Sequence, residues 1–259
     1  MSRIQSIFRP GYRVLIAYLT LGYPSLEATI EAAILLAKSG CDLIELGIPF
    51  SDPLADGATI QKASYQALKQ GVTSQICLEA AQEIKRRIAT PLVFMGYYNP
   101  ILNFGLEAFC HSANRAGVDG LIIPDLPPEE GEELEANMKK HGLDPIYLLS
   151  PASSEERIWL VTQRSRGFIY LVSLIGVTGA RQSLPPGLES FVQRVREKTE
   201  LPLCVGFGIS SPEQAGRVAR IADGVIVGSR LIQLIEEDSS LSSLKSFVRS
   251  LRETLDQYH

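Results

Sequence analysis

The chain has 259 residues, of which 45% are hydrophobic and 21% charged, so it has enough apolar material for a sizeable core and is not a disordered protein. Its 25 basic and 29 acidic residues leave a formal charge of −4, which excludes a basic excess for binding nucleic acid or an anionic membrane. The length suits a single α/β barrel domain over residues 1–259.

Residues 1–26 contain no acid and carry three arginines, as a targeting peptide does. However, the apolar stretch Val14–Leu21 is short and lacks an A-x-A cleavage signal, so we interpret it as a first strand. No apolar run approaches the roughly 18 residues that a membrane span requires. We therefore expect a cytoplasmic protein.

Eight short apolar runs, each followed by a segment with helical periodicity, recur along the chain. They are almost continuously apolar, which is typical of parallel strands covered on both faces. Eight such units fit a (β/α)8 barrel of the TIM type better than an open doubly wound sheet. The predicted strands are Val14–Thr20, Leu43–Gly47, Leu92–Gly96, Gly120–Pro124, Pro145–Leu149, Phe168–Ser173, Leu203–Gly206 and Gly224–Gly228.

Several predicted helices have recognisable start signals. Ser25 is in the position of an N-cap, and Ser211 is another, with Gln214 where a capping box requires it. Acidic residues over Glu129–Glu135 open a further helix that lysines close, which matches the helix dipole.

Cysteines and histidines provide few options for chemistry. The four cysteines lie far apart without a C-x-x-C pair, so we expect reduced, buried thiols. His111 and His141 fall in helix-like stretches and His259 is the last residue, and none has a partner at zinc spacing. The sequence thus predicts no metal site and argues against a Ser-His-Asp hydrolase.

Loops that follow the strands carry the chemistry of such barrels, and the connections 48–91 and 174–202 are longer than a barrel needs. Glu45 lies inside the apolar second strand, where a charge is costly unless it is paired or protonated. The predicted strand cores contain no cation to pair with it, so a catalytic role is favoured over a structural ion pair.

The loop 49–57 carries Asp52 and Asp56 among prolines and glycine. It can deliver a carboxylate over the barrel mouth, where two carboxyl groups in different environments can serve as one acid and one anion. The sequence around Asp56 is equally consistent with an alternative in which both aspartates only cap turns or the next helix.

Glycines follow the last two predicted strands at Gly206, Gly208 and Gly228. Glycine there lets the backbone approach a ligand, and amides at a helix start point at an anion, so we predict a phosphate site. The loop 176–181 has the composition of a lid. Because the strand cores lack a Schiff-base lysine and the chain lacks nucleotide-binding glycine motifs, carboxylate acid–base chemistry on a small phosphorylated substrate remains.

The thirteen residues from Glu45 to Gly57, ELGIPFSDPLADG, closely resemble the signature of the tryptophan synthase α chain family. The resemblance implies a (β/α)8 barrel that cleaves indole-3-glycerol phosphate by a retro-aldol reaction into indole and glyceraldehyde 3-phosphate, without a metal or cofactor. Further matches in register are Tyr18-Leu19-Thr20 with Gly22 and Pro24, Tyr97-Tyr98-Asn99-Pro100, Pro124-Asp125-Leu126-Pro127, Tyr170 with Gly176-Val177-Thr178-Gly179, Gly206-Phe207-Gly208-Ile209 and Gly228-Ser229.

The resemblance also implies roles for individual residues. Glu45 would be the general acid–base that protonates indole C3, and Asp56 would accept a hydrogen bond from the indole N–H. Tyr170 would support Glu45 or the substrate, and Thr178 would join the lid to Asp56. Backbone amides would hold the phosphate at Gly179, Gly208, Gly228 and Ser229. Matching positions for the indole pocket, which are also consistent with ordinary barrel core, are Tyr18, Met95, Ile122, Leu148 and Phe207.

In the family, the barrel mouth docks on a pyridoxal-phosphate β chain in an α2β2 complex, and indole passes internally between the two chains for tryptophan biosynthesis. The loops carrying Pro53 and Asn99 would meet that partner, and this chain would need no pyridoxal phosphate. Leu174 stands where common bacterial members carry an arginine, a departure that bears on lid closure rather than on the catalytic pair.

Three alternatives remain open: a phosphosugar isomerase on the same scaffold, a free-standing lyase, and a non-catalytic subunit that only activates a partner. The thirteen-residue match argues against the isomerase. The carboxylate inside an apolar strand argues against the binding subunit, which has no use for it.

Overall fold

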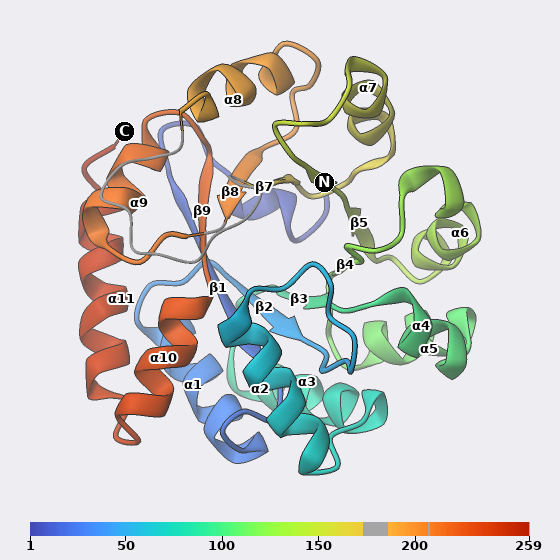
Figure 1. Cartoon of the computed structure of the whole chain (residues 1–259), viewed down its shortest axis with the longest axis vertical. Coiled ribbons are helices and arrows are strands. Elements are labelled where there is room, and N and C mark those ends of the chain that lie inside the picture. Colours follow the sequence, from blue (N-terminus) through green and yellow to red (C-terminus); the bar gives the residue numbers. More distant parts are fainter. Residues whose placement is uncertain (173–185, 207, 259) are drawn as a thin grey trace.

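The computed structural model describes residues 1–172, 186–206 and 208–258, and in these residues one parallel sheet curves into a barrel (Figure 1). The order of the strands in the sheet is β5-β4-β3-β2-β1-β9-β8-β7-β6. The strands are β1 (Val14–Thr20), β2 (Leu43–Gly47), β3 (Leu92–Met95), β4 (Gly120–Ile122), β5 (Asp144–Ile146), β6 (Leu148–Leu149), β7 (Ile169–Val172), β8 (Leu203–Gly206) and β9 (Gly224–Val227). The predicted barrel is therefore confirmed.

The barrel closes at Tyr147, which alone separates β5 from β6 in the chain. Strand β5 pairs with β4 and β6 pairs with β7, so the two edges of the sheet are consecutive segments of one chain. The backbone N–H of Tyr170 donates to the Tyr147 carbonyl at 3.0 Å and carries the ladder across this junction. The prediction of one continuous strand at Pro145–Leu149 is wrong here, because the segment changes its pairing partner at Tyr147.

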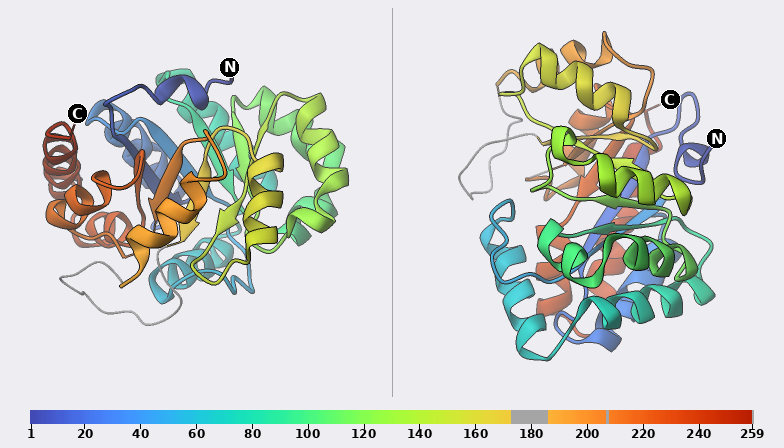
Figure 2. Two further views of the ribbon diagram at one scale, coloured as in Figure 1. Left: turned by 90° about the horizontal axis from the view of Figure 1, so that it is seen from above. Right: turned by 90° about the vertical axis from the view of Figure 1, so that its right-hand side faces the viewer.

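Helices surround the barrel, and the two side views show them on its outer face (Figure 2). Two predicted N-caps are confirmed: the Ser25 hydroxyl accepts from the Ala28 N–H at 3.1 Å, and the Ser211 hydroxyl accepts from the Gln214 N–H at 3.3 Å. The helices are α1 (Leu26–Lys38), α2 (Ala58–Lys69), α3 (Ser74–Arg87), α4 (Tyr98–Phe104), α5 (Leu106–Arg115), α6 (Glu132–Lys140), α7 (Glu155–Arg164), α8 (Leu188–Arg196), α9 (Pro212–Ala219), α10 (Ser229–Glu237) and α11 (Ser242–Leu255), with short 3-10 helices η1 (Gln5–Ile7) and η2 (Pro128–Glu130).

Several connections differ from the simple strand-helix pattern, such as the one between β3 and β4, which holds both α4 and α5. The long segment after β2 holds the additional helix α2 before α3. The helix expected over Glu129–Glu135 begins later, at Glu132, because Gly131 separates it from the 3-10 turn η2. Gly131 packs against Tyr147, whose hydroxyl would lie 2.3 Å from a Cβ at this position. Within the described ranges, every helix is too short or too polar to span a lipid bilayer.

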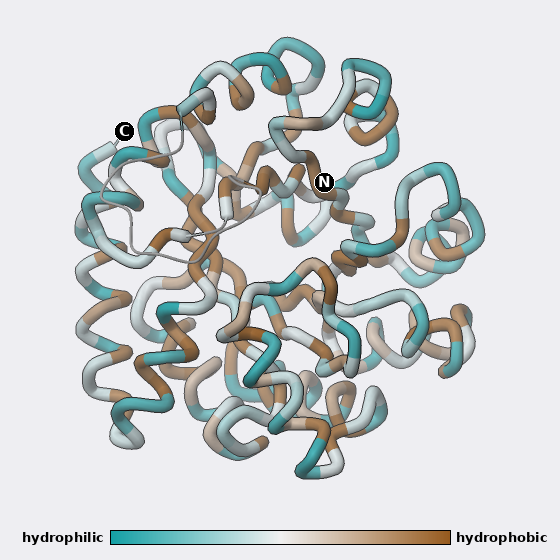
Figure 3. The backbone as a smooth tube through the Cα atoms, in the orientation of Figure 1, coloured by the Kyte–Doolittle hydropathy of each residue, from teal (hydrophilic) through white to brown (hydrophobic). Residues whose placement is uncertain are grey.

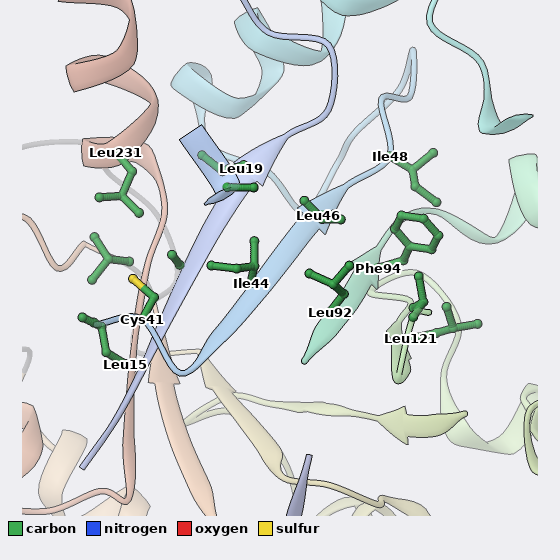
Figure 4. Packing of buried hydrophobic residues seen from close by; sticks show 14 of the residues in the cluster. Leu15, Leu19, Cys41, Ile44, Leu46, Ile48, Leu92, Phe94, Leu121 and Leu231 are labelled. Carbon is green, nitrogen blue, oxygen red and sulfur yellow. The ribbon is translucent and has the colours of Figure 1, made fainter. Parts of the chain in front are cut away.

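Alternate residues of each strand enter two separate apolar layers. The outer layer lies between the strands and the helices and includes Leu19, Ile44 and Phe94, as Figure 4 shows for β1 to β3. The inner layer fills the barrel and includes Ile16 and Val93. Two-sided burial explains why the strand sequences are almost continuously apolar and why hydrophobic segments concentrate at the centre of Figure 3. The four cysteines are free and buried, as predicted.

The N-terminal segment closes one end of the barrel. Ile4 is fully buried in the inner layer and lies against Gly120 and Gly167, where an added Cβ would come within 2.9 Å of its side chain. Arg3 anchors this segment through Asp119 at 3.5 Å. Figure 2 shows the N-terminal segment and the β2–α2 connection at opposite ends of the barrel, so the loops after the strands surround the other end, its mouth.

Candidate active site

Glu45 lies in the middle of β2 and points into the barrel. Its register partners are Tyr18 on β1 and Val93 on β3, both members of the inner layer. The carboxyl group is completely buried, and neither oxygen has a hydrogen-bond partner among the described residues. Burial, reinforced by the charge of Asp56, raises the pKa of Glu45 to about 8. The carboxyl group is therefore neutral at pH 7 and able to donate a proton.

Asp56 lies in the loop between β2 and α2, two residues before the helix begins. Its backbone N–H donates to the Pro53 carbonyl at 3.0 Å, which tightens the loop. One side-chain oxygen, Oδ2, accepts a hydrogen bond from the Tyr97 hydroxyl at 3.2 Å, while Oδ1 is buried without a partner in the described part of the chain. Burial raises the pKa of Asp56 to about 6, and the hydrogen bond from Tyr97 opposes this shift. Asp56 is consequently ionised at pH 7.

The other aspartate of the loop, Asp52, has a different environment. It is exposed and accepts a hydrogen bond from the neighbouring Ser51 hydroxyl. Its carbonyl accepts from the Leu54 N–H at 2.9 Å, as in a tight turn. The turn-forming role that the sequence leaves open for both aspartates thus describes Asp52, whereas Asp56 faces the buried site.

Tyr18 and Tyr170 lie inside the barrel next to the two carboxyl groups. Both hydroxyls occupy space that glycines leave free: a Cβ at Gly47 would lie 2.2 Å from the Tyr18 hydroxyl, and one at Gly206 would lie 2.4 Å from that of Tyr170. Burial, together with the charges of Asp56 and Glu45, keeps the pKa of each tyrosine well above its ordinary value. They therefore remain neutral and provide hydroxyl groups without charge.

Three further residues predicted for an indole pocket belong to the inner layer: Met95 and Ile122 as core members, and Leu148 as a partly buried neighbour. Met95 pairs in register with Gly47 and with Ile122, close to the mouth ends of β2 and β4. This placement suits an apolar pocket and equally suits barrel core. Thr178, Gly179 and Phe207, together with Leu174 of the lid, lie outside the described residues.

The glycines predicted for a phosphate site follow β8 and β9. Gly208 has a φ of +77° with open space where a side chain would stand, so this turn requires glycine. Gly228 precedes α10 and Ser229 is its first residue. The start of α10 lacks a side-chain cap among the described residues, unlike that of α9, which Ser211 caps. Backbone amides at the start of α10 are suited to an anion.

The sequence pattern does not single out Tyr97, which lies two residues after the end of β3, at the N-cap of α4, and binds Asp56 directly. Its position in the matching motif after the third strand was the only available signal. Tyr97 and Leu54 line a groove of about 380 Å³ at the rim of the mouth. The remaining lining residues are Phe50, Asp52, Ala55, Pro124 and Asp125.

The fold also brings together two histidines that sequence spacing keeps apart. The rings of His111 on α5 and His141 after α6 meet edge to face, with centroids 5.3 Å apart. Among the described residues, however, groups of three or more histidine, cysteine or carboxylate side chains that could hold a metal ion do not occur. The pair lies on and after the helices α5 and α6, not on a strand or mouth loop that carries a predicted site residue.

Comparisons with known proteins agree with this geometry. The sequence model of the family described as "Tryptophan synthase alpha chain" matches residues 5–258. The tryptophan synthase alpha chain of Dehalococcoides mccartyi is 56% identical over 256 residues, which cover 99% of this chain and 100% of that relative. The one from Petrotoga mobilis is 48% identical over 257 residues, covering 97% and 99%.

Solved structures of tryptophan synthase also match this chain over almost its whole length. The tryptophan synthase of Mycobacterium tuberculosis matches with a TM-score of 0.92 at 39% identity, covering 98% of each chain. The alpha chain from Legionella pneumophila matches with a TM-score of 0.91 at 38% identity, covering 99% of this chain and 98% of the other. The chain therefore belongs to the tryptophan synthase alpha chain family.

Proposed function

We propose that Glu45 and Asp56 carry out the reaction of this family in the present chain. The reaction is the cleavage of indole-3-glycerol phosphate to indole and glyceraldehyde 3-phosphate. The observation that carries the assignment is a fully buried Glu45 on β2 next to Asp56 on the adjacent loop, with both Glu45 oxygens and Asp56 Oδ1 buried without a hydrogen-bond partner among the described residues. Two carboxyl groups whose environments separate their pKa values are a common basis for dividing acid and anion roles.

In this mechanism Glu45 donates its proton to C3 of the indole ring, and positive charge develops at the ring nitrogen. Asp56 accepts a hydrogen bond from the indole N–H and stabilises that charge. The Glu45 carboxylate then takes the proton of the side-chain hydroxyl next to the ring. The bond from C3 to that carbon breaks, its electron pair restores the indole, and the carbon becomes the aldehyde. Glu45 ends the cycle protonated again.

The phosphate group would bind at the start of α10. Gly228 and Ser229 supply backbone at this point, Gly208 follows the neighbouring strand β8, and the uncapped amides of α10 favour negative charge. Gly228 also lies against Tyr18, because a Cβ added at Gly228 would lie 3.3 Å from the Tyr18 side chain. This contact would join the phosphate end of the substrate to the wall of its ring pocket.

The partner would dock at the barrel mouth. Leu54 is 93% exposed at the groove described above, and Leu102 on the neighbouring α4 is 49% exposed. Exposed apolar side chains around a groove are typical of a protein interface. We assign this surface to a tryptophan synthase β chain in an α2β2 complex, which would receive the indole and hold the pyridoxal phosphate. Residues 1–259 would act as one barrel domain in the cytoplasm.

The direct test is indole release from indole-3-glycerol phosphate by the purified chain, alone and with a purified β chain. Weak release alone and strong release with the partner supports the α-chain assignment. Strong release without a partner indicates a free-standing lyase. If indole is not released under either condition, the assignment is wrong and the isomerase or a binding subunit takes its place.

The pH dependence of kcat/KM is expected to be bell-shaped. As the pH falls through about 6, Asp56 takes up a proton and loses the charge that stabilises the indole nitrogen. As the pH rises through about 8, Glu45 loses the proton that it must donate. The two apparent pKa values belong to the interacting pair and can be read from the limbs of the profile. A kcat/KM that stays constant between about pH 5 and about pH 9 would contradict these roles of Glu45 and Asp56.

Replacing Leu54 with aspartate is expected to remove most of the stimulation by the β chain, by about 10-fold or more, because a charge then enters an apolar interface. Indole release without the partner should be unchanged. Trp159→Asp is a matched control, since Trp159 is also an exposed apolar residue, 59% accessible on the outer helix α7. Equal stimulation of the Leu54 variant and the wild type would place the interface elsewhere.

A further inference from the structure

The Tyr97 hydroxyl lies at the centre of a hydrogen-bond chain that ends on Asp56. It accepts from the Ala55 N–H at 3.0 Å and is 3.2 Å from Asp56 Oδ2. A backbone N–H can only donate, so the single phenolic proton remains available for the carboxylate. Tyr97 is 4% exposed, and its hydroxyl therefore bridges the backbone and the side chain of two consecutive loop residues within a protected site.

The ring of Tyr97 is held firmly. It stacks on Phe50 with centroids 5.0 Å apart and an angle of 26° between the planes. The next backbone N–H, that of Tyr98, donates to both oxygens of Asp125 at 3.0 and 3.2 Å. Asp125 follows β4 and Tyr97 follows β3, so the group that binds Asp56 is fixed to two neighbouring strands of the barrel. The loop of Asp56 gains a rigid support that its own sequence does not provide.

The two oxygens of Asp56 have different surroundings. Oδ2 accepts from Tyr97, whereas Oδ1 is buried and has no partner among the described residues. An unpaired buried oxygen is costly, and the proposed substrate carries one N–H that can pair with it. Because the Tyr97 hydroxyl holds Oδ2, the carboxylate is kept in one orientation. In that orientation Oδ1 is free to accept a hydrogen bond from the indole N–H.

We propose that Tyr97 is the positioning residue of Asp56: its hydroxyl fixes Oδ2 so that Oδ1 is presented to the indole N–H. The proposal rests on the proposed role of Asp56 in cleavage. Tyr97 touches the carboxylate and not the reacting carbon, so it acts through Asp56. The same hydrogen bond lowers the pKa of Asp56 against the effect of burial and keeps the carboxylate charged near neutral pH.

The charged and titratable groups that face Asp56 in the described residues come from four elements. Glu45 lies on β2, Tyr18 on β1, Tyr170 on β7 and Tyr97 at the start of α4. The pKa values of the three tyrosines are raised by burial, so these side chains stay neutral through the working range. Of these described groups, Glu45 alone titrates near Asp56, and it does so at higher pH. Removal of the Tyr97 hydroxyl should therefore move the acidic limb of the pH profile and leave the basic limb in place.

The test is Tyr97→Phe, which keeps the stacked ring and removes only the hydroxyl. We expect kcat to fall by about 10-fold or more, the usual effect of losing a hydrogen bond to a charged group. The acidic limb of kcat/KM should move to higher pH. Carbon-13 NMR of the Asp56 carboxyl group in the substrate-free protein should show a raised pKa of Asp56. Tyr98→Phe is the matched control and should leave all three quantities at wild-type values.

The outcomes separate this proposal from the one it rests on. Wild-type kcat and an unmoved acidic limb in Tyr97→Phe, with Asp56→Asn inactive, would overturn the positioning role alone. A fall in kcat with an unchanged pKa of Asp56 would also overturn it, because Tyr97 would then only support the fold. Full activity of Asp56→Asn would remove the proposed role of Asp56, and with it the need for a residue that positions this side chain.

Discussion

Glu45→Gln is expected to abolish indole release, with a fall in kcat of about 1,000-fold or more, because an amide cannot donate the proton that C3 receives. Glutamine has the shape of the neutral carboxyl, so the barrel should keep its fold. The measurement is single-substrate kinetics with indole-3-glycerol phosphate at pH 7, with circular dichroism to check folding. Asp144→Asn is the matched control, because Asp144 is also a buried carboxyl group. It is the first residue of β5 and therefore lies at the end of the barrel away from the mouth.

The same variant tests the buried charge through stability. The native pKa of Glu45 is raised from its ordinary value of 4.5 to about 8, so the folded chain binds the proton more tightly than the unfolded chain. The free energy of unfolding should therefore decrease as the pH rises from 4.5 to 8, and Glu45→Gln should remove this decrease. The expected gain at pH 8 is on the order of 3 kcal/mol in urea titrations, with little difference at pH 4.5. An active Glu45→Gln variant would contradict the assignment. A difference in stability between this variant and the wild type that is the same at pH 4.5 as at pH 8 would also contradict it.

Asp56→Asn is expected to lower kcat by about 100-fold or more, because asparagine keeps the shape of the side chain but loses the charge that opposes the developing positive charge on indole. The acidic limb of the pH profile should disappear, since the group that titrates there is gone. The matched control is Asp52→Asn in the same loop, where the side chain is exposed and bonded only to its neighbour Ser51 among the described residues. Comparable losses in both variants would mean that the loop as a whole, and not this carboxylate, supports the reaction.

Much of the fold follows from local sequence pattern. Parallel strands buried on both faces need continuous apolar runs, and the run Val14–Thr20 coincides with β1. The helix start at Ser25 follows from a side chain that can replace a missing backbone partner. These features depend on neighbours within a few residues, and such interactions are present in the sequence itself. The division of the fifth strand at Tyr147 depends instead on which strands lie on either side, and sequence spacing does not contain that information.

The candidate site divides in the same way. Glu45 stands out because a charge in an apolar run violates a local rule, and Asp56 is found mainly through the thirteen-residue match around it. Tyr97 escapes notice because its partner is 41 residues away and the contact exists only after β2 and β3 pair. The burial of Ile4 is not predicted for a similar reason, since Ile4 packs against Gly120 and Gly167, which are far away in the sequence. The pairs that could not be predicted are those that join distant segments.

The two apolar layers have a consequence for how this protein can evolve. Side chains of the outer layer, such as Leu46, pack in an apolar cluster away from the proposed pocket, so we expect changes there to alter mainly stability and to be compensated by a neighbour. Side chains of the inner layer, such as Met95 and Ile122, serve at once as the core and as the proposed pocket wall. A mutation that adapts the pocket to a differently substituted indole therefore also repacks the core. We expect laboratory selection for new substrates to succeed only when stabilising changes in the outer layer come first.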